Sequence, residues 1–522
     1  MKPDPHGSFA EPPAAASLAD AEDQAGFDLG DWHAFCQELD VAAMVPEAFA
    51  RYRPAILAGL EYFFANLRPE RAVAILAAQL ALPAEAETSE RLVAIAHHCP
   101  ALHKLGQVMA RDRRLPPELR RLLQRLETVP CYTDEAELKA AIERELGPLD
   151  RLGVRLDGPA LAEASVAVVV PYLWQREPES APVRGVFKVL KPDIEANLEE
   201  ELSLLQGVGG LLDERCQALG LPNIAYEETF AQVRALLSRE VYLADEQAHL
   251  AHAAKLYAGV PEVVIPELHP FSGPRITAMG RIDGRKVTDV DDLAAADRRR
   301  LADLVVEALI AMPVWSGGDG AFHADPHAGN LMLTDDGRLA ILDWSLTGTL
   351  TKDEQVQMTQ ILLGAFSIDA PRIIAAITAL AGGAIDRDAL ARVVDRALRR
   401  IGEGRLPGLD WLTHLMDEVA LETRGRFSPG LIIFRKVLQT LDGVVADIAH
   451  DCHVDGVMIG CFLRHFGREW ADRLMAPPFS RALPTHISNA DLFHFAASAP
   501  LGAVRLWLDW QRRWWGEAGP KR

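Results

Sequence analysis

Apolar residues follow two different spacings along this chain, and each spacing predicts a different kind of element. Residues 29–150 place them at helical intervals, for example in Tyr52–Leu67 and Arg71–Leu82, with proline-containing breaks between segments. Further along, β-branched residues gather in two short runs, Val166–Val170 and Gly185–Leu190. The pattern therefore predicts a helical region followed by a β-rich region.

Helical spacing dominates the rest of the sequence. Residues 195–256 return to it, whereas Val263–Pro266 and Arg275–Met279 are typical of strands. We expect Asp297–Trp315 to be an amphipathic helix with Asp297 as its N-cap, and residues 352–470 to be helical again. The chain is thus expected to be α+β.

The stretch Ala321–Ser345 predicts a β-hairpin with polar residues at one end. Leu331–Leu333 and Leu339–Leu342 are short apolar strands, and Gly337 between them permits a tight turn. Asn330 enters this hairpin and Asp343 leaves it, so both side chains are expected at the same end. An amide and a carboxylate placed together suit a hard cation such as Mg²⁺.

Asp325 lies five residues before Asn330. The same step separates the catalytic Asp from the metal-binding Asn in the kinase loop H-R-D-x-x-x-x-N. We therefore interpret the stretch as the catalytic and metal-binding part of a kinase-like fold. The alternative is an ordinary polar hairpin.

Lys188 is the only charge inside the apolar run Gly185–Leu190. A lysine there needs an anionic partner because burying its charge alone is costly, and phosphate oxygens together with a carboxylate would serve. The alternative is a lysine on an edge strand that discourages aggregation. Glu240 and Glu246, on a helix expected to run from Glu240 through Ala254, are candidate partners. Glu199–Glu201 is predicted to be a solvated helix face.

Composition narrows the classes of function. The 522-residue chain carries a net charge of −20, which argues against general nucleic-acid binding. Its six cysteines form no CxxC pair, so a reducing cytoplasm is the simplest location. No apolar run reaches the roughly 18 residues of a membrane-spanning helix. The first residues, rich in Pro, Ala and acidic side chains, are expected to be disordered.

Two further clusters have competing interpretations. Arg505–Trp515 places tryptophans and arginines at helical spacing, which predicts a helix that docks on the protein or lies on a membrane surface. A second group of histidines and cysteines could suggest a metal site, but its spacings fit no zinc pattern well. It comprises His450, Cys452, His453, Cys461 and His465.

With these residues in order, the chain resembles the UbiB/AarF/ADCK family of atypical kinases over roughly residues 100–446. His323–Asn330 is a near-complete form of the family's catalytic-loop signature, and Lys104–Gln107 matches its KxGQ motif. Ala162–Ser165 stands where the family has an Ala-rich loop, and Leu431–Val445 resembles its late helix. The KxGQ match separates the chain from aminoglycoside-phosphotransferase-like kinases, which lack that helical extension.

The resemblance implies a two-lobed protein-kinase-like fold that binds ATP and Mg²⁺. The expected parts are a disordered tail (1–28), a helical extension carrying KxGQ (29–150), a small β-rich lobe with inserted helices (151–283), a helical lobe (284–475) and a tail with the Trp/Arg helix (476–522). Lys188 would bind the α- and β-phosphates and pair with Glu246, and Asp325 would be the catalytic Asp. The implied metal ligands are Asn330, Asp343 and Glu240, and the implied nucleotide contacts are Ala162, Ala164, Ser165, Lys188, Met279, Lys104 and Gln107.

The sequence departs from the family pattern in places. Ala167-Val168 follows the Ala-rich loop where the family has Gly-Gln. The ExD motif is Glu240-Val241-Tyr242, which lacks one carboxylate, and the DFG equivalent is Asp343-Trp344-Ser345. The transmembrane hairpin that some members carry at the C-terminus has no counterpart.

The resemblance implies an ATP- and Mg²⁺-dependent phosphotransferase or ATPase. It would act on, or support the metabolism of, a small or lipid-like molecule of the quinone or isoprenoid kind. The alternative is a nucleotide-binding pseudokinase that scaffolds other biosynthetic proteins. The expected location is the cytoplasm, with peripheral contact to the inner face of the membrane through Arg505–Trp515 as a further expectation.

Overall fold

A computed structural model describes residues 47–83, 86, 88–110, 134–177, 179–221, 225–383 and 385–497. The predicted disordered tail and the Trp/Arg helix lie outside these residues. The chain divides into two compact units, one comprising residues up to Gln247 together with Glu267–Arg281, the other Ala248–Pro266 and the residues from Ile282 onward. The five-part division expected from the sequence stays a prediction.

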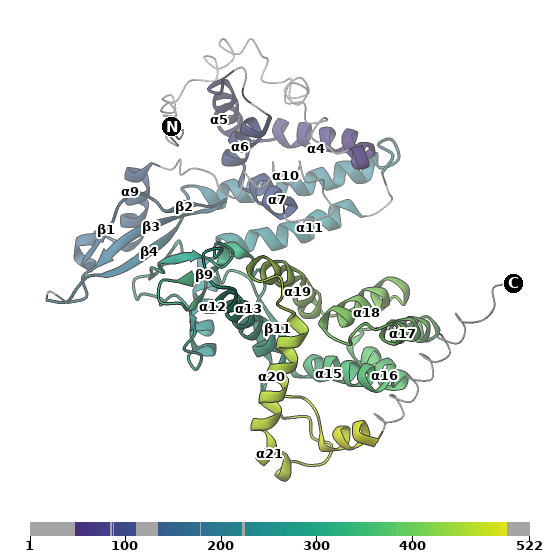
Figure 1. The fold of residues 1–522 in the computed structure, drawn as a ribbon. Coiled ribbons are helices and arrows are strands. Elements are labelled where there is room, and N and C mark those ends of the chain that lie inside the picture. Colours follow the sequence, from purple (N-terminus) through teal and green to yellow (C-terminus); the bar gives the residue numbers. More distant parts are fainter. Residues whose placement is uncertain are drawn as a thin grey trace. The chain divides into compact units, whose positions relative to one another are not determined.

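The first unit contains a five-stranded antiparallel sheet. Its main path is β1 (Val154–Leu156), β3 (Ala167–Trp174), β4 (Val183–Leu190) and β6 (Ile276–Gly280), and the short β2 (Ala162–Glu163) also pairs with β3 (Figure 1). The strands predicted at Val166–Val170, Gly185–Leu190 and Arg275–Met279 are confirmed. Helix α9 (Glu135–Leu146) contributes Leu138 and Ile142 to a core shared with Tyr172 and Phe187 of the sheet.

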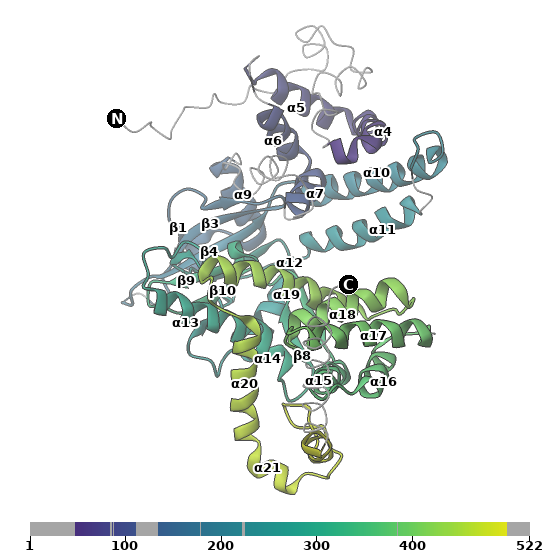
Figure 2. The same ribbon diagram turned by 45° about the vertical axis from the view of Figure 1, so that its right-hand side comes forward.

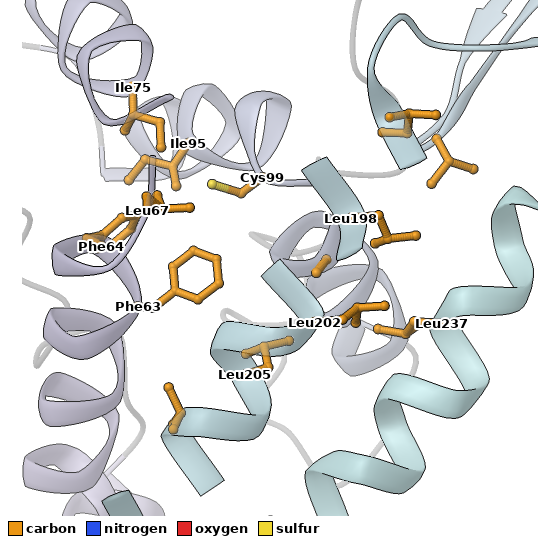
Figure 3. Packing of buried hydrophobic residues seen from close by; sticks show 14 of the residues in the cluster. Phe63, Phe64, Leu67, Ile75, Ile95, Cys99, Leu198, Leu202, Leu205 and Leu237 are labelled. Atoms are coloured by element: carbon orange, nitrogen blue, oxygen red, sulfur yellow. The ribbon is translucent and has the colours of Figure 1, made fainter. Parts of the chain in front are cut away.

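The other elements of the described part of the first unit are helices. They are α4 (Arg53–Ala65), α5 (Pro69–Leu80), α6 (Thr88–His98), α7 (Pro100–Ala110), α10 (Ile194–Arg215) and α11 (Tyr226–Leu237), with short 3₁₀ turns at Glu47–Tyr52, Leu149–Leu152 and Ser238–Val241. Phe63 and Phe64 of α4 share a buried cluster with Leu198, Leu202 and Leu205 of α10 (Figure 3). This cluster joins the N-terminal helices to α10, so the described helices of the region predicted at residues 29–150 share their core with later parts of the first unit.

The helix predicted to start at Glu240 begins later. Glu240 belongs to the 3₁₀ turn, Tyr242 breaks the helical geometry, and α12 runs from Leu243 to Leu256. The first residues of α12, through Gln247, belong to the first unit and the remainder to the second.

The second unit holds two small sheets. One has the order β5 (Val263–Val264), β10 (Leu339–Ile341), β9 (Leu331–Thr334) and β7 (Gly284–Lys286), and the other pairs β8 (Gly320–His323) with β11 (Thr347–Leu350). The predicted hairpin is confirmed as β9–β10, and Gly337 has the positive φ of 82° that its turn requires.

Helices of the second unit follow the predicted pattern with one error at a boundary. Helix α13 (Ala295–Val306) starts after Ala294, so Asp297 lies inside the first turn and is not the N-cap. A π-helical turn (Glu307–Ala311) and α14 (Met312–Val314) continue it. The C-terminal helices are α15 (Lys352–Ser367), α16 (Ala370–Leu380), α17 (Arg387–Gly402), α18 (Leu409–Glu422), α19 (Pro429–Ile448), α20 (Val454–Arg468) and α21 (Trp470–Met475). Figure 2 shows α15 to α18 packed side by side.

Two further findings concern the described helices and cysteines. Among the residues described, none of the helices is long and apolar enough to cross a membrane. The described cysteines Cys99, Cys216, Cys452 and Cys461 are buried free thiols.

Candidate functional site

In the first unit, Lys188 and Glu246 form a buried ion pair. The Lys188 Nζ lies 2.8 Å from each carboxylate oxygen of Glu246, and the two side chains are 16% and 6% exposed. Strand β4 lies between β3 and β6, so the alternative of an edge-strand lysine is wrong. The bidentate contact offsets the cost of burying both charges and fixes the ammonium group on the sheet. The implied pairing is therefore present, and the role of Lys188 in nucleotide binding stays a prediction.

The Ala-rich segment is a tight turn between β2 and β3. Ala162 is exposed, the Ala164 N–H donates to the Ala167 carbonyl at 2.8 Å, and Ser165 is buried. The residue that anchors this turn is Glu163, whose side chain is only 1% exposed and whose Oε1 lies 2.7 Å from the Lys191 Nζ. Sequence reasoning missed it because its partner, Lys191, lies after the end of β4 and is not a sequence neighbour.

His97 of α6 approaches the same carboxylate at 3.6 Å. Burial, together with the neighbouring His98 and Lys191, lowers the pKa of His97 to about 4, so its imidazole is neutral at pH 7. Lys191 is consequently the charged partner of Glu163, while His97 links the N-terminal helices to the turn.

The KxGQ residues lie on α7, which is held at its N-terminus by α10. The Ala101 N–H donates to Glu201 Oε2 at 2.7 Å, and Arg71 of α5 contacts both Glu200 and Glu201. Glu201 is fully buried, so the prediction of a solvated face is wrong for it and for Glu200, whose side chain is 14% exposed.

The other predicted contacts of the first unit are spread over several elements. Lys104 is partly buried on α7, and Gln107 lies one turn further along this helix with its side chain outside the described part. Met279 is a partly buried residue of β6 opposite Val186 of β4. Glu240 lies in the 3₁₀ turn, and its side chain is also outside the described part. The roles of these residues in the site stay predictions.

In the second unit, Asn330 connects the catalytic-loop segment to the hairpin. Its side-chain Nδ2 donates to the backbone carbonyl of Asp325 at 3.1 Å. Its backbone carbonyl accepts from the Leu342 N–H at 2.8 Å. The hairpin register places Leu331 opposite Ile341, so Asn330 and Asp343 leave it at the same end, as predicted. An amide group fixed through its nitrogen presents its oxygen, which is the atom that a magnesium ion would use.

His323 ties the two loops of the second unit together. Its Nδ1 accepts from the Asp325 N–H at 3.1 Å, and its Nε2 lies 3.0 Å from the Leu342 carbonyl and 2.9 Å from that of Asp343. Burial lowers the pKa of His323, which keeps the ring neutral with its hydrogen on Nε2, the tautomer these partners require. The sequence presented His323 only as one letter of a motif.

Asp343 has a left-handed backbone, with φ of 51°. This conformation is uncommon outside glycine, although Asp and Asn adopt it most readily, and such strained residues concentrate at functional sites. The following Trp344 is buried and donates from Nε1 to the Ile341 carbonyl at 3.1 Å, while its own carbonyl contacts His249 Nδ1. The buried indole therefore fixes the chain immediately after Asp343.

Side chains of His327 and Lys436 approach the Asp325 carboxylate, which is 19% exposed. His327 Nε2 lies 3.7 Å from Oδ2, and Lys436 Nζ of α19 lies 3.8 Å from Oδ1. Neither was predicted as a site residue. His327 belongs to the loop motif, so the sequence contained a local signal for it. Lys436 is distant from this loop in the sequence, and no local signal connected it to Asp325.

A magnesium site at Asn330 and Asp343 would depend on few protein ligands. The described residues contain no group of three or more His, Cys, Asp or Glu side chains that could hold a metal, and this includes the cluster around His450 and Cys461. Magnesium commonly keeps water and substrate phosphates in its coordination shell and takes only one or two protein ligands. The pair present here fits that chemistry.

Comparison with known proteins places this geometry in a family. Residues 127–377 match the ABC1 atypical kinase-like domain. This match, which covers just under half of the chain, and the curated relatives support the UbiB/ADCK family of atypical kinases. This confirms the resemblance seen in the sequence and the mixed, kinase-like fold class. The matched range includes Lys188, Glu246, Asp325, Asn330 and Asp343.

Curated relatives carry the same family name. Two proteins called probable protein kinase UbiB, from Xanthomonas campestris pv. campestris strains B100 and 8004, are each 27% identical over 285 residues, covering 52% of this chain. The chain spans about half, 50%, of the length of these relatives. A solved complex of Rv3197 with erythromycin from Mycobacterium tuberculosis is 17% identical with a TM-score of 0.44, covering 66% of this chain and 86% of that one.

Proposed function

We propose that this protein is an ATP- and Mg²⁺-dependent phosphotransferase or ATPase of the UbiB type, with a small or lipid-like acceptor. The observation that supports it most is the arrangement around His323, a neutral buried imidazole that holds the backbones of Asp325 and Asp343 together. A neutral imidazole leaves the negative charge of both aspartates available for chemistry. The family membership and the Lys188–Glu246 pair support the same function.

Each residue has a distinct task in this proposal. Lys188, oriented by Glu246, binds the α- and β-phosphates of the nucleotide. Asn330 and Asp343 hold magnesium, which neutralises charge that develops on the phosphates. Asp325 orients the acceptor hydroxyl or water and accepts its proton while the acceptor oxygen bonds to the γ-phosphorus and ADP leaves. Positioning and charge neutralisation supply most of the acceleration.

Asp325→Asn tests the central step. This variant keeps the size and the backbone contacts of the side chain but cannot accept a proton. We expect phosphate release from ATP to fall by at least about a hundredfold, the usual contribution of a general base, while nucleotide affinity stays within about threefold. Asp335→Asn, at the exposed turn of the same hairpin, is the matched control. Unchanged hydrolysis in Asp325→Asn would remove the assignment.

A pseudokinase scaffold is the second candidate, and one observation favours it. Tyr242 stands where the ExD motif has its second carboxylate, so this position has no acidic side chain that could bind a metal. The Tyr242 side chain is 59% exposed. Thermal-shift titration with ATP, with and without Mg²⁺, followed by a phosphate-release assay over candidate lipids and phenols separates the two functions. Nucleotide binding without turnover on every acceptor favours the scaffold.

The acceptor class and the membrane contact belong to the proposal as well. The family is linked to quinone and isoprenoid-lipid metabolism, and a lipid-like acceptor calls for contact with a membrane surface. Arg505–Trp515 is the segment we propose for this contact, since its tryptophans and arginines suit an anionic interface. Co-sedimentation with anionic liposomes, compared with a chain ending before Leu501, tests it, and equal binding by both chains would remove the idea.

A further inference from the structure

Lys436 lies beside the proposed catalytic aspartate although it comes from a late helix. Its Nζ is 3.8 Å from Asp325 Oδ1, and its side chain is 63% exposed. The matched kinase-like range ends at residue 377, so Lys436 falls outside it. The contact is formed entirely within the second unit.

The position of Lys436 is set by the packing of α19. Phe434 meets Phe322 of β8 edge to face at 5.1 Å between ring centroids, and β8 leads directly into the Asp325 loop. At the start of the helix, a Cβ on Gly430 would lie 2.4 Å from the Thr349 carbonyl of β11, so glycine is needed for this close approach. Because α19 is fixed against both β8 and β11, Lys436 is aimed at the loop by buried apolar contacts.

The pair with Asp325 does not explain Lys436 through stability. An ion pair with such an exposed lysine contributes little, because water screens it and the side chain loses rotamer freedom. The neighbouring Arg435 shows the difference, since its guanidinium contacts Asp417 of α18 at 2.6 Å and joins two helices. Lys436 Nζ instead combines solvent access with closeness to the carboxylate that would receive the acceptor proton.

We propose that Lys436 binds an oxygen of the γ-phosphoryl group and stabilises it during transfer. This inference rests on the proposed function. In the transfer, the acceptor O–H gives its proton to Asp325, the acceptor oxygen bonds to the γ-phosphorus, and the bond from that phosphorus to the ADP oxygen breaks. Lys436 keeps its three hydrogens and donates a charge-assisted hydrogen bond to a phosphoryl oxygen. The negative charge of this oxygen attracts the ammonium group in competition with the Asp325 carboxylate.

Binding of MgATP and MgADP by Lys436→Gln provides the test, because only ATP carries the γ-phosphoryl group. We expect Lys436→Gln to weaken MgATP binding on the order of tenfold and to leave MgADP binding within about twofold. Phosphate release should fall at least as much. Lys436→Arg keeps the charge and should retain most of the ATP preference. Lys255→Gln, an exposed lysine of α12 in the same unit, is the matched control.

Two results would overturn the inference. The first is an unchanged ATP-to-ADP preference in Lys436→Gln, whether neither nucleotide or both nucleotides bind more weakly. The second is the same loss of preference in Lys255→Gln. Thermal melts of each variant separate a change in binding from unfolding. Because the Lys436 side chain is exposed, its substitution should leave the protein folded. If the unmodified protein binds neither nucleotide, the proposed function itself fails, which is a distinguishable outcome.

Discussion

A single buried imidazole organises the candidate site of the second unit. His323 accepts from the Asp325 N–H and donates toward the carbonyls of Leu342 and Asp343. None of these partners is a side chain, so the geometry constrains the backbone on either side of each aspartate. The two aspartates therefore depend on one residue that need not touch substrate.

His323→Phe should damage both stability and activity. The phenyl ring fills the space but leaves an N–H and two carbonyls without their partner, and each buried unsatisfied group costs about 1–3 kcal/mol. We expect the free energy of unfolding of the second unit to fall by about 3 kcal/mol or more. Urea denaturation followed by tryptophan fluorescence measures it. A loss below about 1 kcal/mol would show that the hydrogen bonds do not hold the loops.

His486 predicts an acid sensitivity of the second unit. It is fully buried, donates from Nε2 to the Val314 carbonyl at 2.7 Å, and burial lowers its pKa to about 4. The unfolded chain, with an ordinary histidine pKa near 6.5, binds more protons between about pH 6.5 and 4, so folding stability falls as pH decreases through this window.

His486→Gln should flatten this pH dependence. Glutamine keeps a donor but has no proton to gain, so the variant should be less stable at pH 7.5 and lose less stability than the unmodified protein between pH 6.5 and 4.5. Denaturation at matched pH values measures the two slopes. Parallel curves for both proteins would rule out His486 as a source of acid sensitivity.

At the scale of elements, α7 depends on a carboxylate from α10. Glu201 accepts from the Ala101 N–H and pairs with Arg71, and burial raises the pKa of Glu201 to about 7. A buried carboxylate with a raised pKa is costly to ionise, so the helix carrying Lys104 is fixed only while Arg71 compensates that charge.

Arg71→Met should therefore destabilise the first unit strongly. Removing one partner of a buried ion pair costs about 3–5 kcal/mol, and we expect faster amide hydrogen exchange in α7. Arg68→Met is the matched control, since Arg68 contacts the same acidic pair through Glu200 but is 48% exposed, and its loss should cost less than about 1 kcal/mol. Equal losses in the two variants would contradict the role of burial.

The elements that could be predicted from the sequence are those whose signals are local. The β9–β10 hairpin, with its turn at Gly337, follows from alternating apolar residues and a glycine. One error arose where a partner that is distant in the sequence determines whether a residue is buried or exposed. Glu201 belongs to an acidic run that is typical of a solvated face, and its partners on other helices, Arg71 and the Ala101 N–H, make it a core residue. Asp297 was placed at the wrong helix position because N-cap preferences tolerate shifts of a residue or two.

The same division applies to the candidate site. The closeness of Asp325, Asn330 and Asp343 could be predicted because their spacing and the hairpin place them within one local stretch, whereas their catalytic and metal-binding roles stay predictions. The pair of Lys188 and Glu246 needed the family resemblance in addition. Glu163 and Lys436 could not be predicted as site residues. Their contacts, with Lys191 and with Asp325, join segments that are not neighbours in the sequence.

At the scale of the whole molecule, the net charge of −20 opposes an anionic nucleotide. Long-range repulsion is screened beyond about 8 Å at physiological ionic strength, so affinity must come from local positive charge. The proposed sources are Lys188, Lys436 and magnesium held at Asn330 and Asp343. ATP without magnesium should consequently bind more weakly than MgATP.

Asp343→Asn isolates the contribution of magnesium. Asparagine tolerates the left-handed backbone at this position better than other residues with side chains and keeps the size of aspartate, so the variant should fold. At a MgATP concentration of about 100 times Kd, binding adds about 2.7 kcal/mol of stability to the unmodified protein and raises its Tm. We expect Asp343→Asn to lose the difference between MgATP and ATP alone while keeping the smaller shift with ATP. Asp335→Asn should behave like the unmodified protein, and an equal magnesium increment in Asp343→Asn would exclude Asp343 as a ligand.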